Sequence, residues 1–119
     1  MPDLRRVFGN KAEDLAAAFL KKKGLKILAQ QYKTNIGEID LVAKDGDEIV
    51  FVEVKARRSS HFGYPEESVT KSKLKKIVLV AEQYLREKKF ERAPFRIEVI
   101  AIELDQEPPK VTHLEGVGL

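Results

Sequence analysis

Three carboxylates and one ammonium group recur at alternate positions in two segments that lie close together in the sequence. Glu38 and Asp40 stand in the first segment, and Glu53 and Lys55 stand in the second. Carboxylates crowded together repel each other by roughly 4 kcal/mol per close pair at an effective dielectric near 20. Protonation, solvent exposure or a hard divalent cation could relieve that repulsion, and carboxylate oxygens are the ligands that such a cation prefers.

A lysine beside such a cation would add a second chemical role. Lys55 follows Glu53 by two residues, which places both side chains on the same face of a strand. There the Lys55 side chain could orient an attacking water as an ammonium, or deprotonate that water as a neutral amine. The competing interpretation is that these residues are solvated polar groups on an open sheet face, with Lys55 balancing the acids. The residues by themselves support both interpretations equally.

A hairpin is needed to bring the two segments together. Asp45-Gly46 is a strong hairpin-turn signal, and the segments on either side are rich in β-branched residues. A two-residue turn there predicts that Glu38 lies opposite Glu53, with Asp40 diagonal to Glu53 at ~7–8 Å between backbones. A four-residue loop keeps this arrangement, whereas a three-residue loop without a bulge would scatter the cluster. The other face of the hairpin would be apolar, formed by Ile39, Leu41, Val50, Val52 and Val54.

The remaining elements follow from hydrophobic periodicity and from turn residues. We expect the order α-β-β-β-α-β-β, which predicts an α/β fold with a mixed sheet of about five strands flanked by two helices. The expected segments are a helix over 10–23, strands over 25–32, 37–44 and 48–56, a second helix ending near residue 89, and strands over 95–104 and 111–114.

The second expected helix presents one apolar face, formed by Leu74, Ile77, Val78, Ala81 and Leu85. Leu79 and Val80 fall off this face, which indicates a second contact or a subunit interface such as that of a homodimer.

Composition narrows the class of protein. The chain has 119 residues, 43% hydrophobic and 34% charged, which predicts a single domain over 1–119 with a buried core. The absence of cysteine excludes a disulfide scaffold, a thiolate metal site and a cysteine nucleophile. The two histidines, His61 and His113, look isolated and give a zinc site little support.

No apolar run approaches the ~20 residues of a membrane helix, and the start lacks the apolar core of a signal peptide, so we expect a cytoplasmic protein without membrane association.

Positive charge is concentrated in one part of the chain. The net charge is only +3, but seven basic residues stand against two acidic ones between Lys55 and Lys76. Such an excess favours a polyanionic partner, although a lysine-rich solvated helix face explains it about as well. Besides Lys55, the basic residues are Arg57, Arg58, Lys71, Lys73, Lys75 and Lys76.

The motifs taken together resemble those of the bacterial YraN family, and through it the restriction-endonuclease superfamily that includes archaeal Holliday-junction resolvases. The resemblance covers nearly the whole chain. It is carried by Gly9, Glu13-Asp14-Leu15-Ala16, Gly37-Glu38-Ile39-Asp40-Leu41-Val42, Phe51-Val52-Glu53-Val54-Lys55, and Phe62-Gly63 with Pro65.

This resemblance implies a restriction-endonuclease-like fold and a role for each motif residue. Asp40 and Glu53 would hold Mg²⁺ or Mn²⁺ with help from the Val54 carbonyl, and Lys55 would assist the water. Glu38 belongs to the family's own pattern, and the expected register makes it either an alternative ligand or a residue that contacts the ligands from outside. Glu13 matches a helical acid that some members add, but Asn10 and Glu13 also have the spacing of a helix-capping box.

The function expected from these features is metal-dependent hydrolysis of DNA phosphodiesters, with branched DNA suggested by the resolvase resemblance. The basic residues from Arg57 to Lys76 would hold the flanking backbone. The alternatives are a nucleic-acid-binding module that does not cut, and an interaction domain that docks another protein through Leu79 and Val80.

Overall fold

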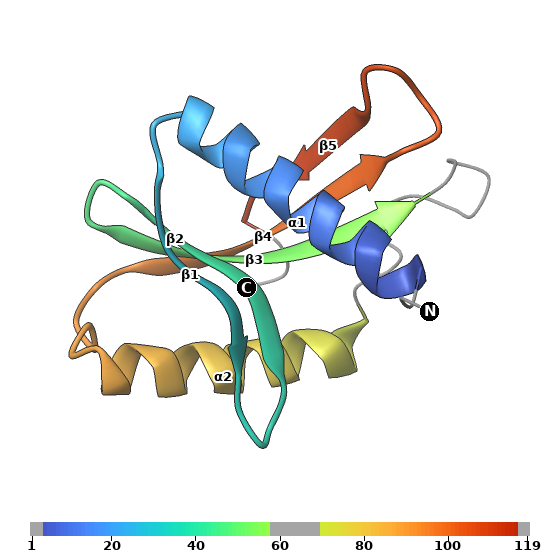
Figure 1. The fold of residues 1–119 in the computed structure, drawn as a ribbon. Helices are drawn as coiled ribbons and strands as arrows, with labels where there is room; N and C mark the ends of the chain where they lie inside the picture. Colours follow the sequence, from blue (N-terminus) through green and yellow to red (C-terminus); the bar gives the residue numbers. More distant parts are fainter. Residues whose placement is uncertain (1–3, 58–69, 117–119) are drawn as a thin grey trace.

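The structure is a computed structural model that describes residues 4–57 and 70–116, with side chains from residue 11 onward (Figure 1). Within these ranges the chain forms two helices and five strands in the predicted order α-β-β-β-α-β-β. They are α1 (Leu4–Lys22), β1 (Lys26–Lys33), β2 (Glu38–Asp45), β3 (Glu48–Arg57), α2 (Lys71–Glu87), β4 (Phe95–Glu103) and β5 (Lys110–Leu114).

The strands form one mixed sheet in the order β1-β2-β3-β4-β5. Neighbouring strands are antiparallel except β3 and β4, which are parallel. A parallel pair needs a long crossover connection, and α2 lies within it. The predicted mixed α/β architecture is therefore confirmed.

Each face of the sheet is covered by one helix (Figure 1). On one face, Ala16 and Leu20 of α1 pack with Leu41 and Val52 in a fully buried cluster. On the other face, α2 packs against a second cluster that includes Phe51. Because both faces of the central strands are covered, polar side chains can reach solvent only near the strand ends.

The β2–β3 turn differs from the predicted one. Gly46 and Asp47 form the turn, and Asp45 pairs with Glu48. Gly46 has a φ of +61°, a left-handed conformation that glycine adopts without strain. The predicted pairing was thus wrong by two residues. Because two is an even number, the shift does not exchange the faces of β3 relative to β2.

Ile39 lies on the other face from the predicted one. It packs in the α2 cluster, whereas Leu41 packs in the α1 cluster as expected. Gln31, beside this part of β2, has a φ of +51°, and the far end of the β1–β2 hairpin bends over α2 (Figure 1). This bend turns Ile39 and its partner Tyr32 toward Tyr84 of α2.

The start of α1 and the buried face of α2 both differ from the sequence prediction. Since α1 begins at Leu4 and runs through Asn10, that residue is not an N-cap and the capping-box interpretation of Glu13 was wrong.

In α2, Leu79 is 50% exposed as expected, but Val80 is only 1% exposed and belongs to the core. Val80 is buried because the core-facing side of α2 is centred on it and Tyr84, rather than on Val78. In the described ranges, neither helix is long and apolar enough to cross a membrane.

Candidate active site

Backbone pairing between β2 and β3, the β2–β3 ladder, ends before Asp40, where a side-chain hydrogen bond joins the two strands instead. Backbone pairing between these strands runs from Asp45–Glu48 to Leu41–Val52, and the next positions are Asp40 and Glu53. There the Val54 N–H donates a hydrogen bond of 2.8 Å to Asp40 Oδ2. A side-chain carboxylate thus satisfies a strand amide and holds Asp40 close to β3.

Asp40 lies in an environment that opposes its negative charge. Burial, followed by the neighbouring charge of Glu53, raises the pKa of Asp40 to about 7, although the bond from Val54 lowers it. The charges of Glu13 and Glu38 add to the increase. The charges of the acids that the sequence singled out therefore act on one another at Asp40, although no three of their ligand oxygens lie within 4.8 Å of one another in the described ranges.

Glu53 and Lys55 form an ion pair on β3, with 3.3 Å between Glu53 Oε1 and Lys55 Nζ. Their side chains are 19% and 24% exposed, so solvent screens this pair less than it would a fully exposed one. Glu38 is exposed at the start of β2. Lys55 therefore balances one carboxylate of a larger set of acids, which we call the acidic group: Glu13, Glu38, Asp40 and Glu53.

Glu13 brings α1 to the same acidic group. Gln31 Nε2 donates a hydrogen bond of 3.2 Å to Glu13 Oε2. The other oxygen, Oε1, is buried and accepts no hydrogen bond from residues 4–57 and 70–116. Burial raises the pKa of Glu13, as do the charges of Glu38, Asp14 and Glu53, whereas the Gln31 bond lowers it. A buried carboxylate oxygen without a donor is unfavourable, and a cation or a water bound to it would supply the missing partner.

The lysines of α2 divide between two surfaces. Lys73 and Lys76 line a hollow of about 150 Å³ together with Glu38 and Glu53, which places them at the acidic group. Lys71 and Lys75 instead line a groove of about 540 Å³ with three apolar residues of α2. The apolar residues of this groove are Leu74, Val78 and Leu79. The four lysines of α2, which were expected to hold the nucleic-acid backbone together, therefore lie on two separate surfaces.

The other predicted basic residues lie before α2 in the chain. Arg57 is the last residue of β3, two positions beyond Lys55 and on the same side by alternation. Arg58 and His61 fall outside the described residues.

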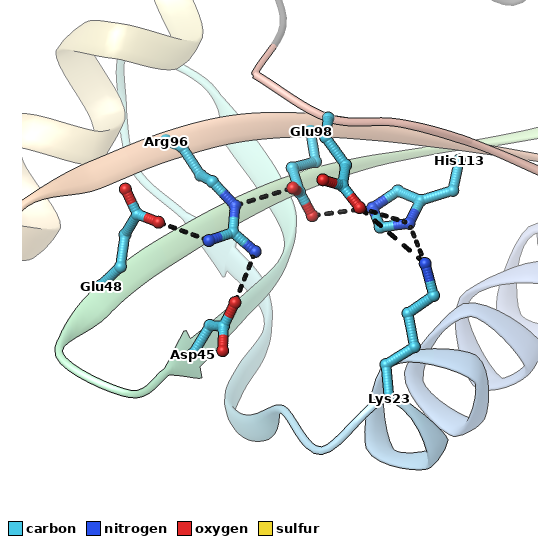
Figure 2. Close-up of polar contacts among 7 residues, drawn as sticks. Lys23, Asp45, Glu48, Arg96, Glu98 and His113 are labelled. Atoms are coloured by element: carbon cyan, nitrogen blue, oxygen red, sulfur yellow. Dashed lines mark hydrogen bonds and ion pairs between the residues drawn. The ribbon is translucent and has the colours of Figure 1, made fainter.

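A buried ionic network, which the sequence interpretation missed, surrounds Glu98 (Figure 2). Glu98 is fully buried, and its two oxygens lie 2.7 Å from Arg96 Nε and 2.8 Å from His113 Nε2. Arg96 also binds Glu48 and Asp45, so it joins the β2–β3 turn to β4.

His113 is therefore not isolated. It lies next to Glu98 and Glu115, and Lys23 Nζ is 3.1 Å from its Nδ1. Both Glu98 oxygens already have partners, so the network fastens strands together and needs no metal. The signal that could have revealed it is the charged pair Arg96 and Glu98 within a strand that is otherwise apolar up to its last residue, Glu103.

Comparison with known proteins matches residues 12–102 to the uncharacterised protein family UPF0102. A UPF0102 protein of Pelotomaculum thermopropionicum is 43% identical over 115 residues, covering 97% of this chain and 95% of its own. Relatives from Clostridioides difficile and Caldicellulosiruptor saccharolyticus are 43% and 42% identical, covering 89% and 82% of this chain and 91% and 83% of their own. These matches confirm the resemblance to the YraN family, and the chain belongs to the UPF0102 family.

Proposed function

We propose that the protein is a metal-dependent nuclease that hydrolyses DNA phosphodiesters. The observation that supports this most is the convergence of carboxylates from three elements beside one lysine. Glu13 comes from α1, Asp40 from β2 and Glu53 from β3, and Lys55 is ion-paired with Glu53.

The residues present fit a hard divalent cation. Every candidate side-chain ligand is a carboxylate, and one buried oxygen of Glu13 has no donor among the described residues. Asp40 and Glu53 would hold Mg²⁺ or Mn²⁺, and the negative charges of Glu38 and Glu13, which act on Asp40, would add to the attraction for the cation. When bound, the cation would lower the pKa of a nearby water and neutralise negative charge on the phosphate.

The chain's own groups supply orientation and charge. The Val54 N–H fixes one oxygen of Asp40, and Gln31 fixes one oxygen of Glu13, so both carboxylates are positioned before substrate binds. The Lys55 ammonium, which is ion-paired with Glu53, would orient the attacking water by a hydrogen bond and stabilise the charge that develops on the phosphate.

A non-cleaving nucleic-acid-binding module is the second candidate function. Lys73 and Lys76 at the acidic group favour it, because these lysines could bind a phosphate backbone whether or not the carboxylates support catalysis. Metal-dependent cleavage would distinguish the two functions. Branched DNA as the preferred substrate rests on the resolvase resemblance.

The test is incubation of the protein with single-stranded, duplex, flap and four-way DNA, with and without Mg²⁺ or Mn²⁺. We expect cleavage only with metal, its loss in Asp40→Asn and Glu53→Gln, and a decrease of about 100-fold or more in Lys55→Ala with metal affinity retained. Glu91→Gln, an exposed change in the turn after α2, is the charge-matched control and should cleave normally. If the parent protein cleaves none of these DNAs but binds them, the binding-module function replaces the nuclease.

A further inference from the structure

Two lysines from different elements meet at the acidic group. Lys55 lies on β3 and is ion-paired with Glu53, and Lys73, on the first turns of α2, lines a hollow with the same Glu53. Bringing two ammonium groups together is unfavourable unless an anion lies near both. Glu53 supplies part of that negative charge through its ion pair with Lys55.

The hollow beside these lysines is small. Its volume is about 150 Å³, roughly that of five water molecules in the liquid, and well below the size of most sites for organic ligands. Lys73 and Lys76 of α2 line one side of it, and Glu38 at the start of β2 lines the other together with the preceding Gly37. A single phosphate group is therefore a better fit to this space than a nucleobase.

A phosphate group approaching Glu53 and Asp40 would be repelled by both carboxylates. Ammonium groups on the facing helix offset this repulsion and hold the phosphate near the acids. Helical spacing aims Lys73 and Lys76 at the hollow, whereas Lys71 and Lys75 point to the apolar groove on the other side.

We propose that Lys55, Lys73 and Lys76 form an anion site that holds the phosphodiester group of a DNA strand against the acidic cluster. This inference rests on the proposed nuclease function and specifies which basic residues touch the substrate at the site. Lys73 and Lys76 are substrate-binding residues, and Lys71 and Lys75 are not.

The test compares Lys73→Gln with Lys75→Gln, because both remove one positive charge from an exposed position of the same helix. Binding of a fluorescent four-way DNA is measured by anisotropy in EDTA over a range of salt concentrations. Lys73→Gln should decrease the slope of log affinity against log salt by about one, while Lys75→Gln leaves the slope unchanged. With Mg²⁺, kcat/KM should fall about 100-fold in Lys73→Gln only, and Lys73→Arg should recover most of it.

The outcomes separate this inference from the nuclease proposal. Equal effects of Lys73→Gln and Lys75→Gln on the salt slope overturn the anion site, whatever the cleavage result. Cleavage by Lys73→Gln at the parent rate also overturns it while leaving the nuclease function standing. A selective effect of Lys73→Gln on binding by a protein that cleaves no DNA supports the anion site and rejects the nuclease.

Discussion

Asp40 combines a structural bond with an unfavourable charge. Its carboxylate accepts the Val54 N–H, yet burial and the charge of Glu53 raise its pKa to about 7. The folded protein therefore binds the Asp40 proton more tightly than the unfolded chain does, whose aspartate has a pKa near 4. The contribution of Asp40 to stability is fully present below pH ~4 and is lost as the pH rises through about 7.

Asp40→Asn should accordingly stabilise the metal-free protein at high pH. The amide oxygen of asparagine can still accept the Val54 bond, while the buried charge is removed. After a discount for partial exposure, we expect the free energy of unfolding to rise by about 1–2 kcal/mol at pH 8.5 and by less at pH 5. Urea unfolding in EDTA measures both values. Asp14→Asn, an exposed change on α1, is the control, and a loss of stability in Asp40→Asn at pH 8.5 would contradict the expected charge strain.

At the scale of single elements, the β2–β3 hairpin shows what the sequence could predict. Alternation of apolar and polar residues predicted both strands and the side of β3 on which Glu53 and Lys55 lie. The pairing could not be predicted, because the segment Asp45-Gly46-Asp47 allows a turn at either dipeptide and both place glycine within it. The side occupied by Ile39 depended on a backbone bend at Gln31, which no residue-type pattern indicates.

The hairpin turn itself can be tested at Gly46. No atom lies within 4 Å of the position that a Cβ would occupy there, so the effect of a side chain comes from backbone strain at φ +61°. Gly46→Ala should therefore lower the free energy of unfolding by about 1 kcal/mol, and Gly46→Asn by less, since asparagine tolerates this conformation. Chemical unfolding of the two variants provides the comparison. Equal stability of the alanine variant and the parent would show that the turn is not the observed one.

At the scale of the whole molecule, the β2–β3 ladder has two different ends. Near the turn, Arg96 ties Asp45 and Glu48 to the buried Glu98. At the other end, backbone pairing gives way to the contact between Asp40 and Val54, where the acids converge. The pairing of Glu98 with His113 joins β4 to β5 and depends on strand register, which is why the sequence did not reveal it.

Glu98→Gln should separate stability from activity. It removes the charge that Arg96 and His113 share, and loss of one partner from a buried ionic network costs about 3–5 kcal/mol. The melting temperature should fall strongly, while metal and DNA binding by the folded fraction should stay within about twofold of the parent. Glu115→Gln, at the exposed edge of the same network, should have little effect on melting. Loss of DNA binding by folded Glu98→Gln would show that the two ends of the ladder are coupled.

The bond from Val54 to Asp40 also gives the protein an internal spectroscopic reporter. Most strand amides donate to carbonyl groups, whose acceptor strength does not change with pH, but this amide donates to a group that gains or loses a proton near pH 7. The Val54 amide resonance should therefore shift with a midpoint near pH 7 in metal-free protein, while amides in the middle of β4 stay constant. A cation that captures the Asp40 carboxylate would abolish this titration, so a single NMR signal can report whether the site is protonated, charged or filled.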